Sequence, residues 1–155
     1  MKIAKNYDDI NWQQCRKELF RLQFEVLKAY RTNDKEKFNK IQQAQHSLTR
    51  SFAARCLAVR KVTSNSGKDT PGIDKVVYKT KKEKFDIIKE IKDLSHYKAQ
   101  PVRRVYISKS NNKLRPLGIP TMKDRIVQTL FHFAIDPIVE ETTDSRSYGF
   151  RLYKE

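Results

Sequence analysis

Apolar residues recur along this chain at two different periods, and each period predicts a different kind of element. Over residues 12–30 they return every three or four positions and leave a largely basic opposite face, which predicts an amphipathic helix. Asn33 and Asp34 interrupt the pattern and can cap a second helix, whose apolar positions continue over residues 38–59. Two long helices joined by a short turn predict an antiparallel helix hairpin.

The next part of the chain is predicted to hold a loop and then a third helix. Residues 63–74, TSNSGKDTPGID, gather Gly, Pro, Ser and Asn, a composition typical of loops. Residues 81–94 place apolar side chains every three positions, which predicts a helix. The loop therefore separates the helix hairpin from the rest of the chain.

A period of two after Pro101 predicts a β-hairpin. Residues 102–107 are rich in β-branched and aromatic side chains, the sequence SNNK supplies turn formers, and residues 114–119 can return as the second strand. Pro116 lacks a backbone N–H, so we expect the return strand at an edge or near a bulge.

A last helix is predicted to follow the β-hairpin. Thr121 and Asp124 form a Thr-x-x-Asp pattern that can cap a helix, and apolar positions continue to Ile135. Asp136 and Pro137 are expected to kink or end this helix. Together these elements predict an α+β fold that is mostly helical, with an N-terminal helix hairpin and a small antiparallel sheet.

The charge of the chain indicates an anionic partner. Its 155 residues hold 33 Lys and Arg against 18 Asp and Glu, a net charge of +15. Nucleic acid is the commonest partner that neutralises such an excess, although an anionic membrane or an acidic protein surface would do the same. No apolar run is long enough for a signal peptide or a membrane span, which predicts a soluble protein inside the cell. Cys15 and Cys56 are too few for a disulfide framework or a zinc site, so we expect buried thiols.

Three cations, Lys109, Lys113 and Arg115, cluster on the predicted β-hairpin. Lys offers a mobile point charge and Arg a bidentate fork, so both suit a phosphate. Lys and Pro on an edge strand also discourage aggregation. The hairpin alone leaves both interpretations open.

The sequence QPVRRVYISKSNNKLRPLGIPTMKDRIVQTL, residues 100–130, strongly resembles the first fingers motif of bacterial and organellar group II intron reverse transcriptases, the intron-encoded maturases. The resemblance extends to both sides. Residues 50–74, RSFAARCLAVRKVTSNSGKDTPGID, are similar to the family's N-terminal segment, NWQQCRKELFRLQFEVLKA at 11–29 to its opening helix, and SYGFR at 147–151 to its next motif. Four matches in the family's order make the resemblance specific.

The resemblance implies roles for particular residues. Lys109 and Arg115 match the two fingers cations that approach the triphosphate of the incoming nucleotide, and the loop over residues 63–74 matches one that covers the template. Ser108 stands where the family usually has proline. RNA-binding candidates are the basic residues of the helices, loop and fingers: Arg50, Arg55, Arg60, Lys61, Lys68, Arg103, Arg104, Lys113, Lys123 and Arg125.

The family's catalytic palm motifs, including Tyr-Ala-Asp-Asp, do not occur in these 155 residues. Polymerisation needs palm carboxylates that hold two metal ions, so we expect no catalytic residue, no cofactor and no activity of this chain alone. Magnesium would be required only if a palm were supplied elsewhere. After SYGFR the family continues with Pro-Gly-Arg, whereas this chain departs at Leu152, which favours a natural end over a truncation.

These features predict three parts: a helix hairpin over 1–62, a loop over 63–80 and a fingers-like subdomain over 81–155. Without a palm, an apolar face of the last helix is expected to be exposed and to take a protein partner or to self-associate; its residues are Leu130, Phe131, Ile135 and Ile138. The aromatic residues of the first two helices are expected in the core rather than on a base-stacking surface. Later in the chain, Tyr106 and Tyr148 are the aromatic residues that can stack on bases.

Three functions stay open at this point. The first is an RNA-binding protein, inactive as a polymerase alone, that assists intron splicing or belongs to a ribonucleoprotein. The second is a scaffold subunit that docks on a large protein assembly, and the third is the N-terminal piece of an active RNA-directed DNA polymerase. The family implies a bacterial cytoplasm or an organelle, either plastid or mitochondrion, as the location.

Overall fold

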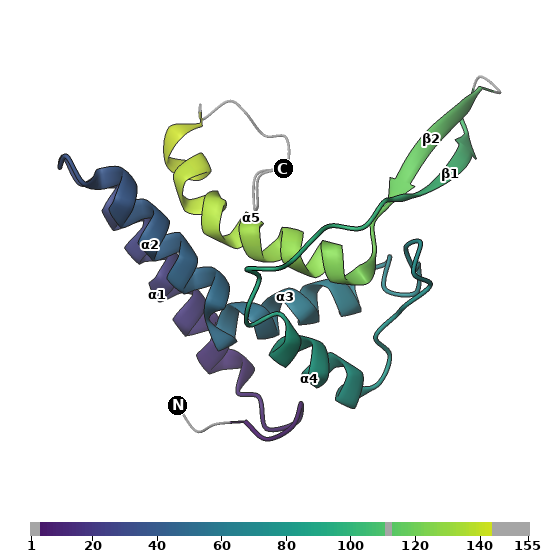
Figure 1. The fold of residues 1–155 in the computed structure, drawn as a ribbon, viewed down its shortest axis with the longest axis horizontal. Coiled ribbons are helices and arrows are strands. Elements are labelled where there is room, and N and C mark those ends of the chain that lie inside the picture. The colour runs from purple at the N-terminus through teal and green to yellow at the C-terminus, as the bar shows by residue number, and fades with distance from the viewer. Residues whose placement is uncertain (1–3, 111–112, 144–155) are drawn as a thin grey trace.

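A computed structural model describes residues 4–110 and 113–143 of the protein (Figure 1). The predicted α+β, mostly helical fold is confirmed: helices form a body from which one β-hairpin projects. In chain order the elements are α1 (Trp12–Arg31), α2 (Lys37–Arg50), α3 (Phe52–Ser64), α4 (Lys81–Glu90), β1 (Arg103–Ser108), β2 (Leu114–Ile119) and α5 (Met122–Thr142).

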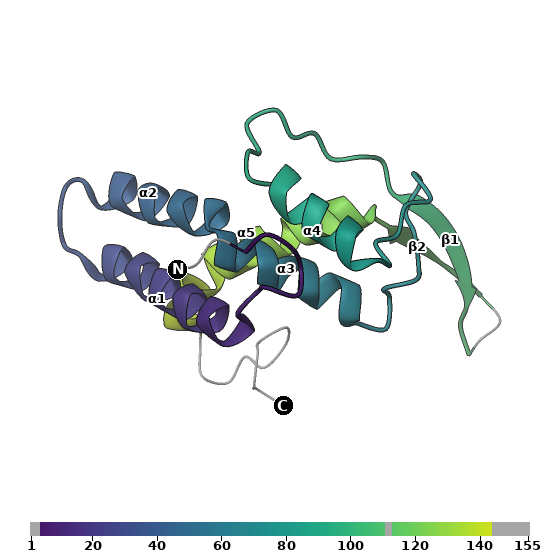
Figure 2. The same ribbon diagram turned by 90° about the horizontal axis from the view of Figure 1, so that it is seen from below.

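The first two helices pack side by side, as the views in Figures 1 and 2 agree. Asn11 caps α1, because its side-chain oxygen accepts a hydrogen bond from the Gln14 N–H at 2.9 Å. The prediction of one continuous second helix over residues 38–59 is wrong. The helix is interrupted at Ser51, which is both the C-cap of α2 and the N-cap of α3. The Ser51 hydroxyl accepts a hydrogen bond from the Ala54 N–H at 3.0 Å, and α3 begins at the next residue.

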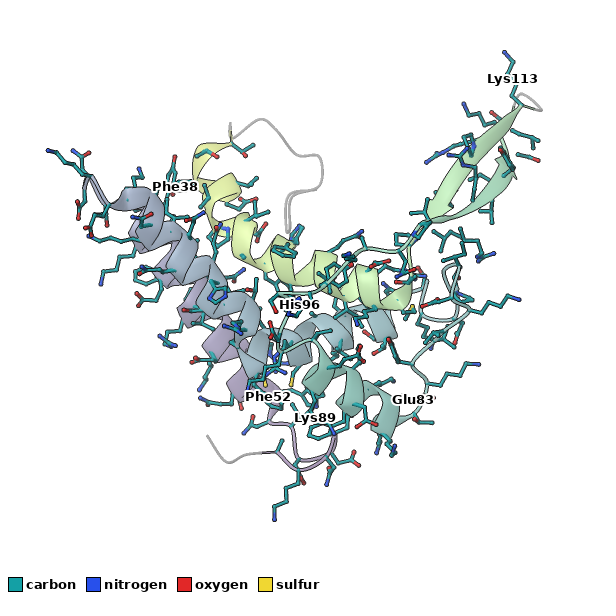
Figure 3. The ribbon with its side chains drawn as sticks, in the orientation of Figure 1. Phe38, Phe52, Glu83, Lys89, His96 and Lys113 are labelled. Carbon is teal, nitrogen blue, oxygen red and sulfur yellow. The ribbon has the colours of Figure 1, made fainter. Side chains whose placement is uncertain are left out.

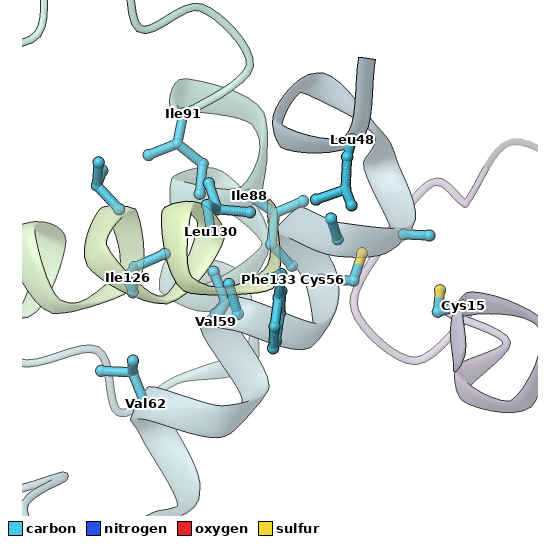
Figure 4. Packing of buried hydrophobic residues seen from close by; sticks show 14 of the residues in the cluster. Cys15, Leu48, Cys56, Val59, Val62, Ile88, Ile91, Ile126, Leu130 and Phe133 are labelled. Atoms are coloured by element: carbon cyan, nitrogen blue, oxygen red, sulfur yellow. The ribbon is translucent and has the colours of Figure 1, made fainter. Parts of the chain in front are cut away.

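Helix α3 lies at the centre of the body and contacts four other helices, α1, α2, α4 and α5. Most of its side chains are buried, and the exposed ones, Arg60, Lys61 and Ser64, lie toward its C-terminal end. Figure 4 shows Cys56, Val59 and Val62 of α3 among Ile88 of α4 and Ile126 of α5. The core therefore joins residues from both sides of the 63–80 loop. Cys15 and Cys56 are free, buried thiols, as predicted.

Helix α4 begins with a capping box in which the Thr80 hydroxyl and the Glu83 carboxylate each accept a backbone hydrogen bond. It ends at Glu90, four residues before the predicted end at Leu94, and Ile91 is its C-cap. Glu83 lies at the outer end of this helix (Figure 3).

The helix after the β-hairpin begins as predicted, because the Thr121 hydroxyl accepts a hydrogen bond from the Asp124 N–H at 3.0 Å. Pro137 does not end α5, which continues to Thr142 and bends in its second half (Figure 1). Proline has no N–H, so the Phe133 carbonyl four residues earlier lacks its helical donor. The Gln23 side chain of α1 donates to that carbonyl at 3.0 Å, and Gln45 of α2 donates to the Ala134 carbonyl at 3.1 Å.

The predicted exposed face of α5 is only partly correct. Leu130 is fully buried, because the side of α5 that carries it packs on α3. Phe131 and Ile135 are each 49% exposed, and Ile138 is half-buried against the core. Val139 completes the exposed apolar row.

The expectation that aromatic residues of the first two helices lie in the core is wrong for three of them. Phe20 and Phe24 of α1 and Phe38 of α2 are exposed, and Figure 3 shows Phe38 near the outer end of α2. The helical period places Phe20 and Phe24 on the side of α1 opposite its buried Cys15, Leu22 and Val26. Tyr148 and the SYGFR motif lie outside the described residues. No helix in the described ranges has the length and apolar character to cross a membrane.

Candidate nucleic-acid interface

The β-hairpin has two faces with different chemistry. β1 and β2 pair in antiparallel register, with Ile107 opposite Arg115 and Tyr106 opposite Pro116. Successive residues of a strand point to opposite faces. The inner face, which packs on the loop at its base, therefore carries Arg103, Val105, Ile107, Arg115, Leu117 and Ile119. The outer face carries Arg104, Tyr106, Ser108, Leu114, Pro116 and Gly118.

The cations at the free end of the hairpin gather on the inner face. The Lys109 N–H donates to the Lys113 carbonyl at 2.8 Å, which continues the ladder one position beyond the last paired residues. By the same alternation these two lysines share the face of Arg115. All three side chains are exposed, and Figure 3 shows Lys113 at the tip. The inner face thus presents three cations on a projecting arm.

Arg103 and Arg104, neighbours in sequence, lie on opposite faces. Arg103 is half-buried, and its Nε donates to the Pro71 carbonyl at 3.1 Å, so this guanidinium holds the hairpin base to the loop. Arg104 is exposed on the outer face. The two side chains therefore cannot both reach the same strand of a ligand from one side.

Arg125, near the start of α5, fixes the same loop. Its guanidinium donates to the carbonyls of Gly67 at 3.0 Å, Pro120 at 3.2 Å and Thr70. Burial lowers the pKa of this guanidinium from its ordinary value, although it stays far above neutrality. Three carbonyl contacts occupy most of its donors, so Arg125 acts chiefly as a clamp on the loop.

Gly72 sets how closely the loop approaches the junction between β2 and α5. A Cβ at this position would lie 2.5 Å from the Thr121 Cα and 2.6 Å from the Thr121 N. Both contacts are with backbone, which cannot swing aside as a side chain can. Only glycine fits here, and the loop thereby packs against the first residues of α5.

Asp124 organises the opposite side of this junction. Its carboxylate accepts hydrogen bonds from the Thr121 hydroxyl at 2.7 Å, the Gln100 N–H at 3.2 Å and the Tyr97 hydroxyl. Burial opposes the charged form, but these hydrogen bonds outweigh it and hold the pKa of Asp124 below its ordinary 3.8. Burial and the bond to Asp124 raise the pKa of Tyr97. The segment that leads into β1 is thus tied to α5.

Acidic residues are absent from the whole hairpin region of the sequence. Between Asp93 and Asp124 there is no Asp or Glu, whereas seven Lys and Arg occur: Lys98, Arg103, Arg104, Lys109, Lys113, Arg115 and Lys123. No ion pair involves Lys109 or Arg115 within the described ranges. The charges of Lys109 and Arg115 are therefore not neutralised by an acidic side chain of the described part of the chain.

The remaining predicted cations fall into two groups. Arg55 is 5% exposed and donates to the Ile88 and Ser51 carbonyls, so it belongs to the packing of α3 and is out of reach of a ligand. The others are at the surface: Arg50 pairs with Asp93 at 3.8 Å, Lys123 with Glu90 at 2.6 Å, Arg60 lies over Trp12, Lys61 over Phe133, and Lys68 is exposed on the loop.

The described residues form an exposed cationic face on the hairpin, but they form no cluster of metal ligands. Among residues 4–110 and 113–143, no three His, Cys, Asp or Glu side chains come together as a metal ion would need. This donor set does not fit the two-metal chemistry of polymerases. No catalytic step is assigned to these residues.

Comparison with known proteins relates this chain to reverse transcriptases and group II intron-encoded proteins. Residues 7–91 match the sequence profile of the N-terminal domain of reverse transcriptase. Protein YkfC of Escherichia coli (strain K12) is 46% identical over 99 residues, which cover 61% of this chain and 26% of YkfC. Group II intron-encoded protein LtrA of Lactococcus lactis subsp. cremoris is 41% identical over 98 residues, 61% of this chain and 16% of LtrA.

A longer alignment relates the chain to Maturase-like protein 1 of Euglena gracilis, 29% identical over 147 residues. It covers 94% of this chain and 31% of the Euglena protein. The chain thus spans between about a sixth and a third of these three relatives. The predicted resemblance to the N-terminal region of reverse transcriptases and maturases is confirmed.

Proposed function

This chain belongs to the family of the N-terminal domain of reverse transcriptase, and we propose that it binds structured RNA through the inner face of its β-hairpin. Lys109, Lys113 and Arg115 hold the phosphate backbone, and Lys68 on the adjacent loop extends the contact. Its cellular role is to assist intron splicing or to take part in a ribonucleoprotein, in a bacterial cytoplasm or an organelle.

The observation that supports this proposal most strongly is the placement of the hairpin charges. Three exposed cations lie on one face of an arm that projects from the body, in a stretch of sequence without acidic residues. Cations that only protected an edge strand would not need to share one face. Phosphate contacts position a protein on RNA and make its affinity depend on salt.

A salt titration tests the proposal. If the three hairpin cations and Lys68 neutralise four phosphates, log affinity should fall with log salt at a slope of about −3. The double variant Lys109→Ala, Arg115→Ala should weaken binding and flatten the slope by about two contacts without unfolding the protein, because exposed charges contribute little to stability.

The matched control removes two cations away from the hairpin. Lys82→Ala with Lys92→Ala, in and just after α4, changes the net charge equally and should leave most of the affinity (Figure 1). Equal losses in the two double variants would show that only total charge matters. Normal RNA binding with increased light scattering in the hairpin variant would instead indicate edge protection.

The alternative function, a subunit that docks on a protein assembly, is favoured by the apolar row Phe131, Ile135 and Val139. The first two line a groove of about 750 Å³ between α2 and α5. Association that survives nuclease treatment, and is lost in Phe131→Ser with Ile135→Ser, would support this alternative. Association that nuclease abolishes supports RNA.

A further inference from the structure

The outer face of the β-hairpin carries a large aromatic side chain that the fold does not use. Tyr106 is 60% exposed at the middle of β1, and it lies outside the hydrophobic core. Its ring has no aromatic or cationic partner within the described ranges. A tyrosine that is mostly exposed on a projecting strand contributes little to the stability of the fold, so its ring is free to contact a ligand.

The neighbours of Tyr106 leave its ring accessible. The residue paired with it is Pro116, whose ring is short, and the residue paired with Arg104 is Gly118, which has no side chain. Val102 fills the space beside Gly118, since a Cβ there would lie 3.0 Å from the Val102 Cγ2. Leu114, diagonal to Tyr106 on the same face, is 63% exposed. The outer face is therefore a shallow apolar platform with an open aromatic ring.

The charge around this platform indicates which kind of ligand its apolar surface suits. Arg104 shares the face two positions from Tyr106, and no Asp or Glu occurs between Asp93 and Asp124. An aromatic ring beside a guanidinium, on a cationic arm, suits a nucleobase with its attached phosphate. Bases within a duplex are stacked on one another and expose only their edges, so such a ring can stack only on an unpaired base.

We propose that Tyr106 on the outer face of the hairpin stacks on an unpaired nucleobase while the inner face holds phosphates, so that the hairpin selects RNA with unpaired nucleotides over uninterrupted duplex. This inference rests on the proposed RNA binding and names its substrate class. The two faces point in opposite directions, so the arm contacts two segments of RNA at once, as it would on entering a loop or a bulge.

The test compares two probes that differ only in pairing: a labelled single-stranded RNA of about twelve nucleotides and the same strand annealed to its complement. In the full chain, Tyr106→Ala should weaken binding of the single strand by about 5- to 150-fold, the range for loss of one aromatic stack. Binding of the duplex should change less than twofold, and Tyr106→Phe should keep both affinities. The salt slope should stay unchanged, because no phosphate contact is lost.

A spectroscopic variant gives a second measurement. The added emission of Tyr106→Trp should be quenched by the single strand and not by the duplex. Equal losses on both probes in Tyr106→Ala, or no loss on either, would overturn the stacking proposal while salt-dependent binding by the unaltered chain still supports RNA binding. Absence of salt-dependent binding of both probes by the unaltered chain would instead overturn the proposed function itself.

Discussion

The Gln23 side chain of α1 donates a hydrogen bond, at 3.0 Å, to the carbonyl of Phe133 in α5. That carbonyl is the one that Pro137 leaves without a helical donor. A residue 110 positions away thus supplies the hydrogen bond that proline removes, and the bend of α5 is held against the helix hairpin (Figure 1).

Replacement of Gln23 should therefore be costly only while residue 137 is proline. Gln23→Ala leaves the Phe133 carbonyl without a partner and should lower the free energy of unfolding by about 1–3 kcal/mol. In a Pro137→Ala background the new N–H can serve the same carbonyl, so the loss should be clearly smaller. Urea denaturation of the unaltered protein, the two single variants and the double variant gives the coupling energy.

Gln13→Ala, at an exposed position of α1, is the control. If Gln23→Ala costs the same stability with Pro137 and with Ala at position 137, then Gln23 does not compensate for the missing proline N–H.

The two glycines of the loop should differ sharply in their tolerance of a methyl group. Gly72→Ala places a Cβ about 2.5 Å from the Thr121 backbone and should cost about 1–3 kcal/mol of stability, because the loop must move. Gly67→Ala meets its nearest atoms at 3.5 Å and should change the stability by less than about 0.5 kcal/mol. Thermal denaturation measures both, and similar melting temperatures for the two variants would contradict this account of the junction.

Asp124 should make the protein sensitive to acid. Its pKa lies below the ordinary 3.8 in the folded state, so its contribution is fully present above the unfolded-state pKa and is lost as the pH falls through the lower folded value. The free energy of unfolding should thus drop below about pH 4. Asp124→Asn should remove most of that slope and also destabilise the protein near neutral pH. Asp69→Asn, at an exposed loop position, serves as the control and should preserve the slope.

Local signals predicted much of the fold. Thr121 was recognisable as a cap because the capping residue and its partner lie three positions apart in sequence, and the hairpin strands followed from their period of two. The break at Ser51 could not be seen from periodicity, because apolar residues keep their spacing through it. Ser51 is a residue type that favours helix N-caps, but Ala54 contributes only its backbone N–H, so the sequence there lacks the capping-box partner that marks Thr80 and Glu83.

The features that could not be predicted depend on long-range packing, which no local sequence pattern encodes. Arg55 looks like any other surface cation in sequence, but its partner is the Ile88 carbonyl 33 positions away. Leu130 and Phe131 are adjacent apolar residues of α5, yet only the first faces α3. On the hairpin, strand alternation in the sequence places Arg103 and Arg104 on opposite faces. Only the observed pairing of β1 with β2 shows which residues of the other strand share each face.

Polymerase activity is not expected from the 155-residue chain by itself. Its described residues do not bring together the carboxylates that two metal ions require, and its sequence lacks the Tyr-Ala-Asp-Asp motif. Primer extension on an RNA template, with magnesium and all four deoxynucleotides, should give no product under conditions in which an active reverse transcriptase extends the same primer. Extension by the pure chain would refute this expectation.

Arg125 and Lys68 were both predicted from sequence to bind RNA, and the structure gives them different contacts. Arg125 donates hydrogen bonds to the carbonyls of Gly67, Thr70 and Pro120, whereas Lys68 is exposed on the loop that Arg125 clamps.

Arg125→Lys keeps the charge but cannot reproduce a planar fork on three carbonyls. It should speed hydrogen exchange at the loop amides of Thr70 and Lys75 and leave the salt slope of RNA binding nearly unchanged. Lys68→Ala should do the reverse, with normal exchange and a slope flatter by about one contact. If Arg125→Lys weakens RNA binding without any change in exchange, then Arg125 contacts RNA directly through its guanidinium fork, and the clamp is not its main role.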